Sequence, residues 1–324
     1  MIVGLCAARQ AVDAGRAGSG KSRGPPGRWE PDRSVLAGEH RGRILALRES
    51  PATGRLDGMG ESAVTAMWER AAGSYDQEVP YFELMGRRIV GYADLQPGQS
   101  LLDVACGAGA VLLPAAEAVG PGRTVVGIDI VAAMLRSATR KADLAGLRVA
   151  TATMDAERLG LKSESFDVVT CAFGLGFFGL DGLREMRRVL RPGGRLVATV
   201  RAHRGPGWEF FDQLCADYGL TNAAYPKGRQ ASRGDLGDSF GQAGLVGLTW
   251  ATDQVTVVFA DPESWWRWVW SHGERGYVER LSESDQPRFR DACYARLEQM
   301  RTPEGIPMTQ YFRVAVAAAP PVQP

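Results

Sequence analysis

Histidine and cysteine are scarce in this chain, and long hydrophobic runs are absent. The 324 residues include 3 His and 5 Cys, and no two cysteines have the C-x-x-C spacing of a zinc or redox motif. This scarcity argues against a metal site. The odd number of scattered cysteines predicts reduced thiols in a cytoplasmic protein. No apolar run approaches the ~18 residues that a membrane-spanning helix requires, so no membrane span is predicted.

Charge of either sign is also not in excess. The formal net charge is +1, from 38 Lys and Arg against 37 Asp and Glu. A balance this close to neutrality gives no indication of a nucleic-acid partner or of an acidic membrane surface. The hydrophobic fraction of 45% and the charged fraction of 23% are ordinary for a globular protein. The composition also does not indicate an oligomeric state.

Residues 1–58 differ from the rest because they are rich in Gly and Pro and show no helical or strand period. Such a segment cannot bury enough apolar surface to offset its ordering entropy, so it is predicted to be disordered or a leader. Residues 15–22 match the phosphate-binding pattern G-x-x-x-x-G-K-S. No buried strand precedes this match and no helix can follow it, which argues against a phosphate-binding loop. The folded domain is predicted to span 59–324.

One stretch combines a strand, a glycine turn and a helix. Residues 101–104 form a short apolar run, Gly107 and Gly109 follow, and 110–119 is rich in helix-forming Ala and Leu. Glycine lets a ligand approach the backbone, and the helix N-terminus offers unpaired N–H groups. A second strand ends at Asp129, whose carboxylate is placed to accept hydrogen bonds from a ribose. A dinucleotide site is disfavoured because the third glycine of its fingerprint would be Leu112.

Four segments in order resemble the class I S-adenosylmethionine (SAM) methyltransferases, in particular the ubiquinone/menaquinone-biosynthesis type and its small-molecule relatives. DVACGAG at 103–109 resembles the first motif, with Ala105 where the first glycine usually stands. GIDIVAAMLRSA resembles the second motif, MDAERLGLKSESFDVVTCAFGLGFF the adenine loop and fourth strand, and REMRRVLRPGGRLVATV the fifth strand. The resemblance runs from about Trp68 to Ala202, and more loosely to Ala317.

The alternation of strands and helices, together with this resemblance, implies a Rossmann-like α/β fold. The sheet is expected to be doubly wound and mostly parallel, with an antiparallel last strand and helical lid elements. Strands are predicted near 100–104, 125–129, 148–153, 167–172 and 195–201, then as a pair at 247–251 and 254–259, and last at 311–317. Two helices are predicted within 61–92, and others over 110–119, 131–144, 179–190, 236–243 and 287–300. Residues 261–263 are predicted to cap a further helix that carries the tryptophans at 265, 266, 268 and 270. Residues 59–96 are the expected lid. Residues 203–230, which are expected to be irregular because they contain Gly205, Pro206 and Gly207, and residues 261–305 are the expected insertions that cover the acceptor.

The resemblance assigns the cofactor to a defined set of positions. They are Tyr75, Asp103, Ala105, Gly107, Gly109, Asp129, Ile130, Met154, Asp155, Ala156, Cys171 and Ala172.

Each assigned role has a structural alternative. Asp129 is expected to hold the ribose and Asp155 to face the adenine amino group, but the two could instead stabilise a turn and cap a helix. Asp103 and the carbonyls near Cys171 and Ala172 are expected to bind the methionine ammonium, although Cys171 could be an ordinary core residue. Tyr75 is expected over the cofactor, or else packs its helix onto the sheet.

The implied reaction is in-line SN2 transfer of the methyl group to a small, largely apolar metabolite, with O- or C-methylation favoured. Catalysis then needs mainly proximity and orientation. If a general base is used, His203 is the candidate, and His272 is a second one. The tryptophans at 265, 266, 268 and 270 either pack both sides of a helix or line an apolar acceptor pocket with Phe177 and Phe178. The alternative function is a scaffold of the same fold that binds SAM without methylating, or a pericyclase-like enzyme.

Overall fold

A seven-stranded sheet organises the computed structural model, which describes residues 61–123, 125–220 and 233–322. Its order is β3-β2-β1-β4-β5-β7-β6. The strands are β1 Leu101–Val104, β2 Val125–Asp129, β3 Ala150–Thr153, β4 Phe166–Ala172, β5 Leu190–Arg204, β6 Val246–Phe259 and β7 Ile306–Ala318. The chain order reverses between β1 and β4, the place where α/β sheets bind ligands beyond the carboxyl ends of their strands.

Strands β1 to β5 pair in parallel, and β7 runs antiparallel to both β5 and β6. The predicted Rossmann-like fold, mostly parallel with an antiparallel end, is therefore confirmed. The predicted strand pair at 247–251 and 254–259 is wrong, because β6 is one strand across that region. Thr252 and Asp253, which lie between the two predicted strands, pair with β7 without a break.

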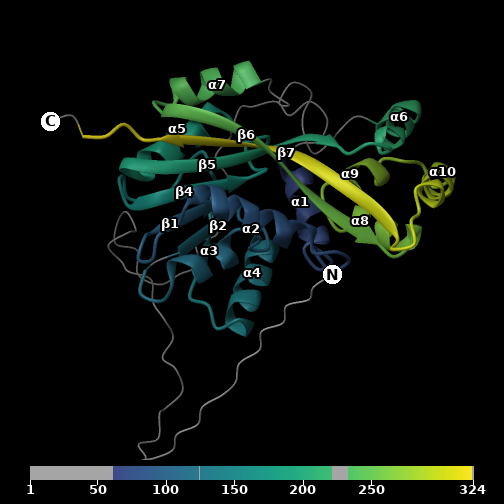
Figure 1. Ribbon diagram of the computed structural model, residues 1–324, viewed down its shortest axis with the longest axis horizontal. Helices are drawn as coiled ribbons and strands as arrows, with labels where there is room; N and C mark the ends of the chain where they lie inside the picture. Colours follow the sequence, from purple (N-terminus) through teal and green to yellow (C-terminus); the bar gives the residue numbers. More distant parts are fainter. Residues whose placement is uncertain (1–60, 124, 221–232, 323–324) are drawn as a thin grey trace, which may run out of the picture. The chain divides into compact units, whose positions relative to one another are not determined.

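Helices cover both faces of the sheet (Figure 1). They are α1 Glu61–Ala71, α2 Tyr81–Ala93, α3 Leu112–Val119, α4 Ala132–Leu144, α5 Leu180–Val189, α6 Glu209–Asp217, α7 Arg233–Gln242, α8 Pro262–Trp270, α9 Arg275–Val278 and α10 Asp285–Gln299. Ile89, Leu112 and Leu135 belong to one buried cluster, so α2, α3 and α4 cover the same face. Leu183 and Phe240 belong to the second cluster, which places α5 and α7 on the opposite face.

Helices α6, α8, α9 and α10 gather around the ends of β6 and β7, beyond the parallel strands (Figure 1). Helix α8 begins at a capping box in which Asp261 accepts from the Ser264 N–H, with Pro262 in the first turn. The region 203–230 was expected to be irregular. Its described part instead extends β5 and forms α6, whose Phe211 is fully buried.

Some predictions fall on residues outside the described ranges. The segment 1–58, the P-loop-like match at 15–22 and the insertion residues 221–230 are among them. Within the described part of the chain, no helix is long and apolar enough to cross a membrane. The same residues contain no cluster of His, Cys, Asp and Glu that could hold a metal ion.

Candidate active site

Three residues in the turn after β1 have positive φ angles. Ala105, Gly107 and Gly109 have φ values of 55°, 53° and 90°. Residues with a Cβ rarely adopt this region, so Ala105 is strained at this position. A Cβ added to Gly107 would meet no heavy atom within 4 Å, whereas one at Gly109 would meet Leu113 Cγ at 3.2 Å. Gly107 therefore faces open space, and Gly109 packs against the helix behind the turn.

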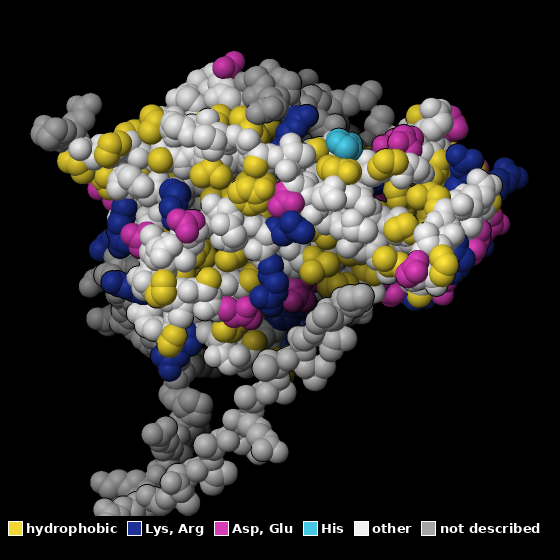
Figure 2. All heavy atoms as spheres, in the orientation of Figure 1, with side chains coloured by type: hydrophobic (Ala, Val, Ile, Leu, Met, Phe, Trp, Pro, Cys, Tyr) yellow, Lys and Arg dark blue, Asp and Glu magenta, His cyan; other side chains and the backbone are white. Residues whose placement is uncertain are grey.

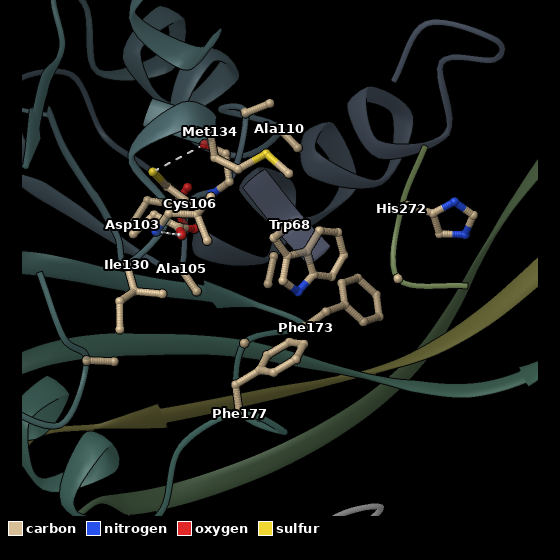
Figure 3. A pocket seen from close by; sticks show the side chains of 18 of the residues that line it. Trp68, Asp103, Ala105, Cys106, Ala110, Ile130, Met134, Phe173, Phe177 and His272 are labelled. Carbon is tan, nitrogen blue, oxygen red and sulfur yellow. Dashed lines mark hydrogen bonds between the residues drawn. The ribbon is translucent and has the colours of Figure 1, made fainter. Parts of the chain in front are cut away.

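The open space beside Gly107 is a cavity of about 240 Å³, far larger than the ~10–15 Å³ that one water needs. It extends from the carboxyl ends of β1 and β2 to α1, α2 and the loop after α8 (Figure 3). Two of the predicted cofactor residues, Gly109 and Cys171, lie behind its wall. The other predicted residues line it: Tyr75, Asp103, Ala105, Gly107, Asp129, Ile130, Met154, Asp155, Ala156 and Ala172.

Asp129 ends β2 and connects two turns. Its Oδ2 accepts a hydrogen bond of 2.9 Å from the Gly107 N–H, and its Oδ1 accepts one of 2.8 Å from the Val131 N–H. Burial raises the pKa of Asp129, and these two hydrogen bonds oppose that rise. The turn-stabilising role is thus present in the structure. An ionised carboxylate can accept about four hydrogen bonds, and Asp129 lines the cavity, so the same side chain can also accept from a ligand there.

Asp103 lies inside β1, with 1% of its surface exposed. Its Oδ1 accepts a hydrogen bond of 2.7 Å from Thr170 Oγ1, while Oδ2 is buried without a partner among the described residues. Burial raises the pKa of Asp103 to about 7, although the Thr170 bond opposes the rise. A buried carboxyl group with an unsatisfied oxygen is costly unless a cation or a donor comes near it. This acid can therefore stabilise a positive charge in the cavity.

One wall of the cavity is suited to a flat aromatic ring. Ile130 follows β2 directly, and 46% of its surface is exposed, which is unusual for a side chain beside a core strand. Met154 and Ala156 line the same region. Asp155 accepts a hydrogen bond of 2.8 Å from the Glu157 N–H. Asp155 therefore stabilises its own loop and lines the cavity at the same time.

Aromatic side chains from the N-terminal helices form the opposite wall. Tyr75 stacks on Phe82 with ring centroids 4.4 Å apart, and Trp68 lies edge-on to Phe177 at 6.3 Å. Figure 3 shows Trp68, Phe173 and Phe177 grouped between the glycine turn and the loop that carries His272. The expected lid thus contributes an apolar surface to the cavity. Tyr75, in the connection between α1 and α2, both packs against Phe82 of α2 and lines the site.

The far end of the cavity carries a buried charged cluster that the sequence interpretation missed. Arg201 of β5 donates a hydrogen bond of 2.9 Å to Glu274 Oε1, and Arg204 contacts the same oxygen. Burial opposes ionisation of Glu274, but Arg204 and Arg201 outweigh it and lower its pKa to about 2. Arg201 and Glu274 are 73 positions apart. No local pattern therefore indicates that they meet.

Neither candidate base presents a nitrogen to the cavity. His203 is exposed, stacks on Tyr311 at 4.5 Å and lies outside the cavity wall, so the structure does not bring it together with the other predicted site residues. His272 lines the cavity, but its ring is directed away from Trp68 (Figure 3) and its Nε2 is buried. His272 Nδ1 lies 2.5 Å from the Trp268 carbonyl oxygen, which can only accept. Burial lowers the pKa of His272 to about 4, so the ring is neutral at neutral pH.

The tryptophan-rich helix does not line the main cavity. Trp265 and Trp268 are 1% and 3% exposed and belong to the core. Trp266 and Trp270 line a separate depression with Pro287. The packing interpretation therefore holds for one side of α8. The predicted acceptor wall instead includes Phe177 and Phe178 without these tryptophans.

Comparison with known proteins agrees with this geometry. A family model described as a methyltransferase domain matches residues 101–194. Nocamycin O-methyltransferase from Saccharothrix syringae is 32% identical over 270 residues, covering 77% of this chain and 95% of that protein. Aklanonic acid methyltransferase from a Streptomyces species is 36% identical over 151 residues, covering 45% of this chain and 69% of that protein.

Further matches concern the core of the fold. The ubiquinone/menaquinone biosynthesis C-methyltransferase of Bordetella parapertussis is 43% identical over 110 residues, covering 33% of this chain and 43% of that protein. A methyltransferase structure from Bacillus halodurans superposes with a TM-score of 0.51 at 20% identity, covering 72% of this chain and 97% of that one, which supports the fold. Because the nocamycin enzyme is 32% identical over 77% of this chain and 95% of its own length, the chain belongs to the class I S-adenosylmethionine-dependent methyltransferases.

Proposed function

We propose that this enzyme transfers the methyl group of S-adenosylmethionine to an oxygen or carbon of a small, largely apolar metabolite. The observation that carries the proposal is the single cavity joining Asp103 and Asp129 to the aromatic rings of Trp68, Tyr75 and Phe177. A polar end and an apolar end in one cavity suit a cofactor and a hydrophobic acceptor side by side. Two relatives are named for methylation of small molecules, nocamycin and aklanonic acid.

The residues present fit the cofactor. Gly107 leaves free the space that a Cβ would occupy, and Asp103 Oδ2 lacks a partner where a cationic ammonium is expected. Asp129 offers acceptor sites for a ribose, and Ile130 offers an exposed apolar face for adenine. When bound, the cofactor supplies an electrophilic methyl group. The contribution of the chain is then to orient the acceptor and to exclude water.

The surface offers little support for a nucleic-acid acceptor. On the face shown in Figure 2, basic and acidic side chains are interspersed, and the described residues there form no patch of one sign. Nucleic-acid binding depends on clustered Lys and Arg that neutralise phosphates. The near-neutral net charge of +1 points the same way. A small molecule within the cavity is therefore the better-supported acceptor.

Isothermal titration with SAM and S-adenosylhomocysteine tests the cofactor half of the proposal. Both should bind, and Asp129→Ala should weaken binding at least about tenfold because the ribose loses its acceptor and the turn its anchor. Asp181→Ala is the control, since that carboxylate lies on α5 with 70% of its side chain exposed. Absence of binding by both ligands would refute the proposal.

A metabolite screen tests the acceptor half. Mass spectrometry should find a product that gains one CH2 unit together with release of S-adenosylhomocysteine. Cofactor binding without any turnover across a broad screen would favour the non-methylating scaffold instead.

A further inference from the structure

Glu274 and Tyr277 lie one helical turn apart at the far end of the cavity. Glu274 directly precedes α9, Tyr277 belongs to that helix, and both residues line the cavity. Residues three positions apart on a helix share a face. The Tyr277 ring packs edge-on against the buried Phe211, with ring centroids 6.1 Å apart. The core therefore holds this ring in place at the cavity wall.

The formal charges at this end of the cavity are balanced. Arg201 and Arg204 both contact Glu274, and Arg204 also pairs with Asp212. His272 is neutral at neutral pH because burial lowers its pKa to about 4. A charged ligand would therefore meet two guanidinium groups and two carboxylates that already neutralise one another. Burial of an unpaired charge is costly, so an uncharged polar group is favoured here.

One oxygen of Glu274 remains available to such a group. Arg201 and Arg204 both contact Oε1, whereas Oε2 lies 3.7 Å from His272 Nε2, too far for a hydrogen bond. Among the described residues, His272 Nε2 is one of the polar atoms that are sealed from solvent without a partner, and Glu274 Oε2 is not. Oε2 therefore offers an acceptor site to the cavity. An anionic oxygen in such an enclosed position is stabilised by a donor from a ligand.

Tyr277 supplies a donor beside this acceptor. Burial raises the pKa of the Tyr277 phenol, and the Glu274 carboxylate raises it further, so the phenol is protonated at neutral pH. A hydroxyl group both donates and accepts a hydrogen bond, and it therefore suits a carboxylate and a phenol side by side. Glu274 has a pKa of about 2 and accepts a proton poorly. A hydroxyl group bound to it stays protonated and is not itself the nucleophile.

We infer that the methyl acceptor carries an uncharged hydroxyl group that donates to Glu274 Oε2 and accepts from the Tyr277 hydroxyl. The inference rests on the proposed methyltransferase function and names its substrate class, a hydroxylated apolar metabolite. Glu274 and Tyr277 lie far from Asp103 and Asp129, at the other end of the cavity. A different atom of the acceptor therefore faces the cofactor. The two residues determine which position is methylated, and the bound hydroxyl group is unchanged in the product.

Three probes of similar size test recognition without knowledge of the acceptor. 2-Naphthol, 2-methylnaphthalene and 2-naphthoate are titrated into protein saturated with S-adenosylhomocysteine, which prevents methyl transfer. We expect 2-naphthol to bind at least about tenfold more tightly than the other two, because only its hydroxyl group donates to the carboxylate. Equal affinities for 2-naphthol and 2-methylnaphthalene would overturn the inference. Tighter binding of 2-naphthoate, or no binding of 2-naphthol, would also overturn it.

Two conservative variants locate the effect. Tyr277→Phe removes the donor but keeps the ring against Phe211, and it should reduce the preference for 2-naphthol about three- to tenfold. Glu274→Asp keeps the charge that Arg201 and Arg204 require but withdraws the carboxylate by one methylene, and it should reduce the preference at least as much. Unchanged binding of S-adenosylhomocysteine and 2-methylnaphthalene shows that the fold is intact. A full preference in Tyr277→Phe would overturn the inference, even if Glu274→Asp failed to fold.

Tyr311→Phe and Glu279→Asp are the matched controls, because neither residue lines the cavity. Tyr311 stacks on His203, and Glu279 pairs with Arg70 and Arg275 just after α9. Both controls should keep the full preference for 2-naphthol. An equal loss in the controls and in the two test variants would contradict the assignment to Glu274 and Tyr277.

The metabolite screen separates this inference from the proposed function. Each acceptor should carry a hydroxyl group that remains free in the methylated product, located by NMR of the product. Methylation of an acceptor without a hydroxyl group, or at its only hydroxyl group, would overturn the inference and leave the methyltransferase function standing. Failure of the wild type to bind S-adenosylhomocysteine would instead refute the proposed function itself.

Discussion

The backbone N–H of Gly107 donates a hydrogen bond of 2.9 Å to Oδ2 of Asp129. This bond connects the turn after β1 with the end of β2. It fixes the distance between the position where backbone approaches the ligand and the carboxylate proposed to hold the ribose. Because both lie at the carboxyl edge of the parallel strands, the fold itself positions the cofactor site. A change at either residue should therefore affect ligand binding more than stability.

The two effects can be separated at Gly107. Gly107→Ala places a methyl group in the open cavity at a φ of 53°. We expect a stability loss of roughly 1 kcal/mol and at least about a tenfold loss of S-adenosylhomocysteine affinity. Gly146→Ala is the control, since its φ of 66° imposes similar backbone strain and nothing lies within 4 Å. Calorimetric titration and thermal unfolding of both variants measure the two effects. Equal affinity losses in both variants would contradict this reading of Gly107.

The raised pKa of Asp103 predicts how the free energy of unfolding changes with pH. Its pKa of about 7 lies above the unfolded value, so the folded state binds more protons between about pH 4 and 7. The contribution of this group to stability therefore falls as the pH rises through that window. Asp103→Asn removes the titration while its Oδ1 can still accept from Thr170. At pH 8 the ligand-free variant should be more stable than the wild type by about 1 kcal/mol or more, measured by denaturant unfolding at several pH values. A difference independent of pH would contradict the assignment.

The cofactor half of this molecule is readable from sequence because its signals are local. The apolar run of β1, the glycines and Asp129 lie within one strand–turn–helix–strand unit, and each spacing has a direct structural meaning. The residues at the far end of the cavity come from distant parts of the chain, so no local signal identifies them. Arg201 and Glu274 meet only after β5 and the loop following α8 come together.

Other features depend on tertiary contacts that local sequence does not indicate. Trp266 and Trp268 occupy one helix, and their spacing does not say which side faces a cavity and which the core. Gly205, Pro206 and Gly207 suggested an irregular segment. They form only a short connection before α6, whose burial against α8 and α10 depends on tertiary contacts.

Ala105 occupies a position whose backbone favours glycine. Its φ is 55°, and Ala105→Gly would remove the strain of the Cβ at that angle. We expect a gain of about 0.5–1 kcal/mol in the free energy of unfolding, measured by urea denaturation. Ala145→Gly is the opposite control, because Ala145 has a φ of −85° and glycine gains nothing there. A destabilised Ala105→Gly would mean that the methyl group has a packing role that outweighs the strain.

Trp68 and Trp266 distinguish the two possible aromatic walls of the acceptor site. Trp68 lines the cavity edge-on to Phe177, whereas Trp266 lies over a separate depression and contacts Phe289. With the acceptor identified by the mass-spectrometric screen, Trp68→Ala should raise its KM about tenfold through lost apolar contact. S-adenosylhomocysteine affinity should change by less than about twofold in either variant, because Ile130 and Met154 still form the other wall.

Trp266→Ala should leave both KM and kcat at the wild-type values, since no part of α8 reaches the cavity wall. Steady-state kinetics on both variants decide between the two walls. If Trp266→Ala raised KM as strongly as Trp68→Ala, α8 would have to approach the acceptor during turnover. The acceptor site would then include the Trp266 side chain, which lies outside the main cavity in this structure. An unchanged KM in Trp68→Ala would instead move the acceptor away from the N-terminal helices and toward Arg201 and Tyr277, at the opposite end of the same cavity.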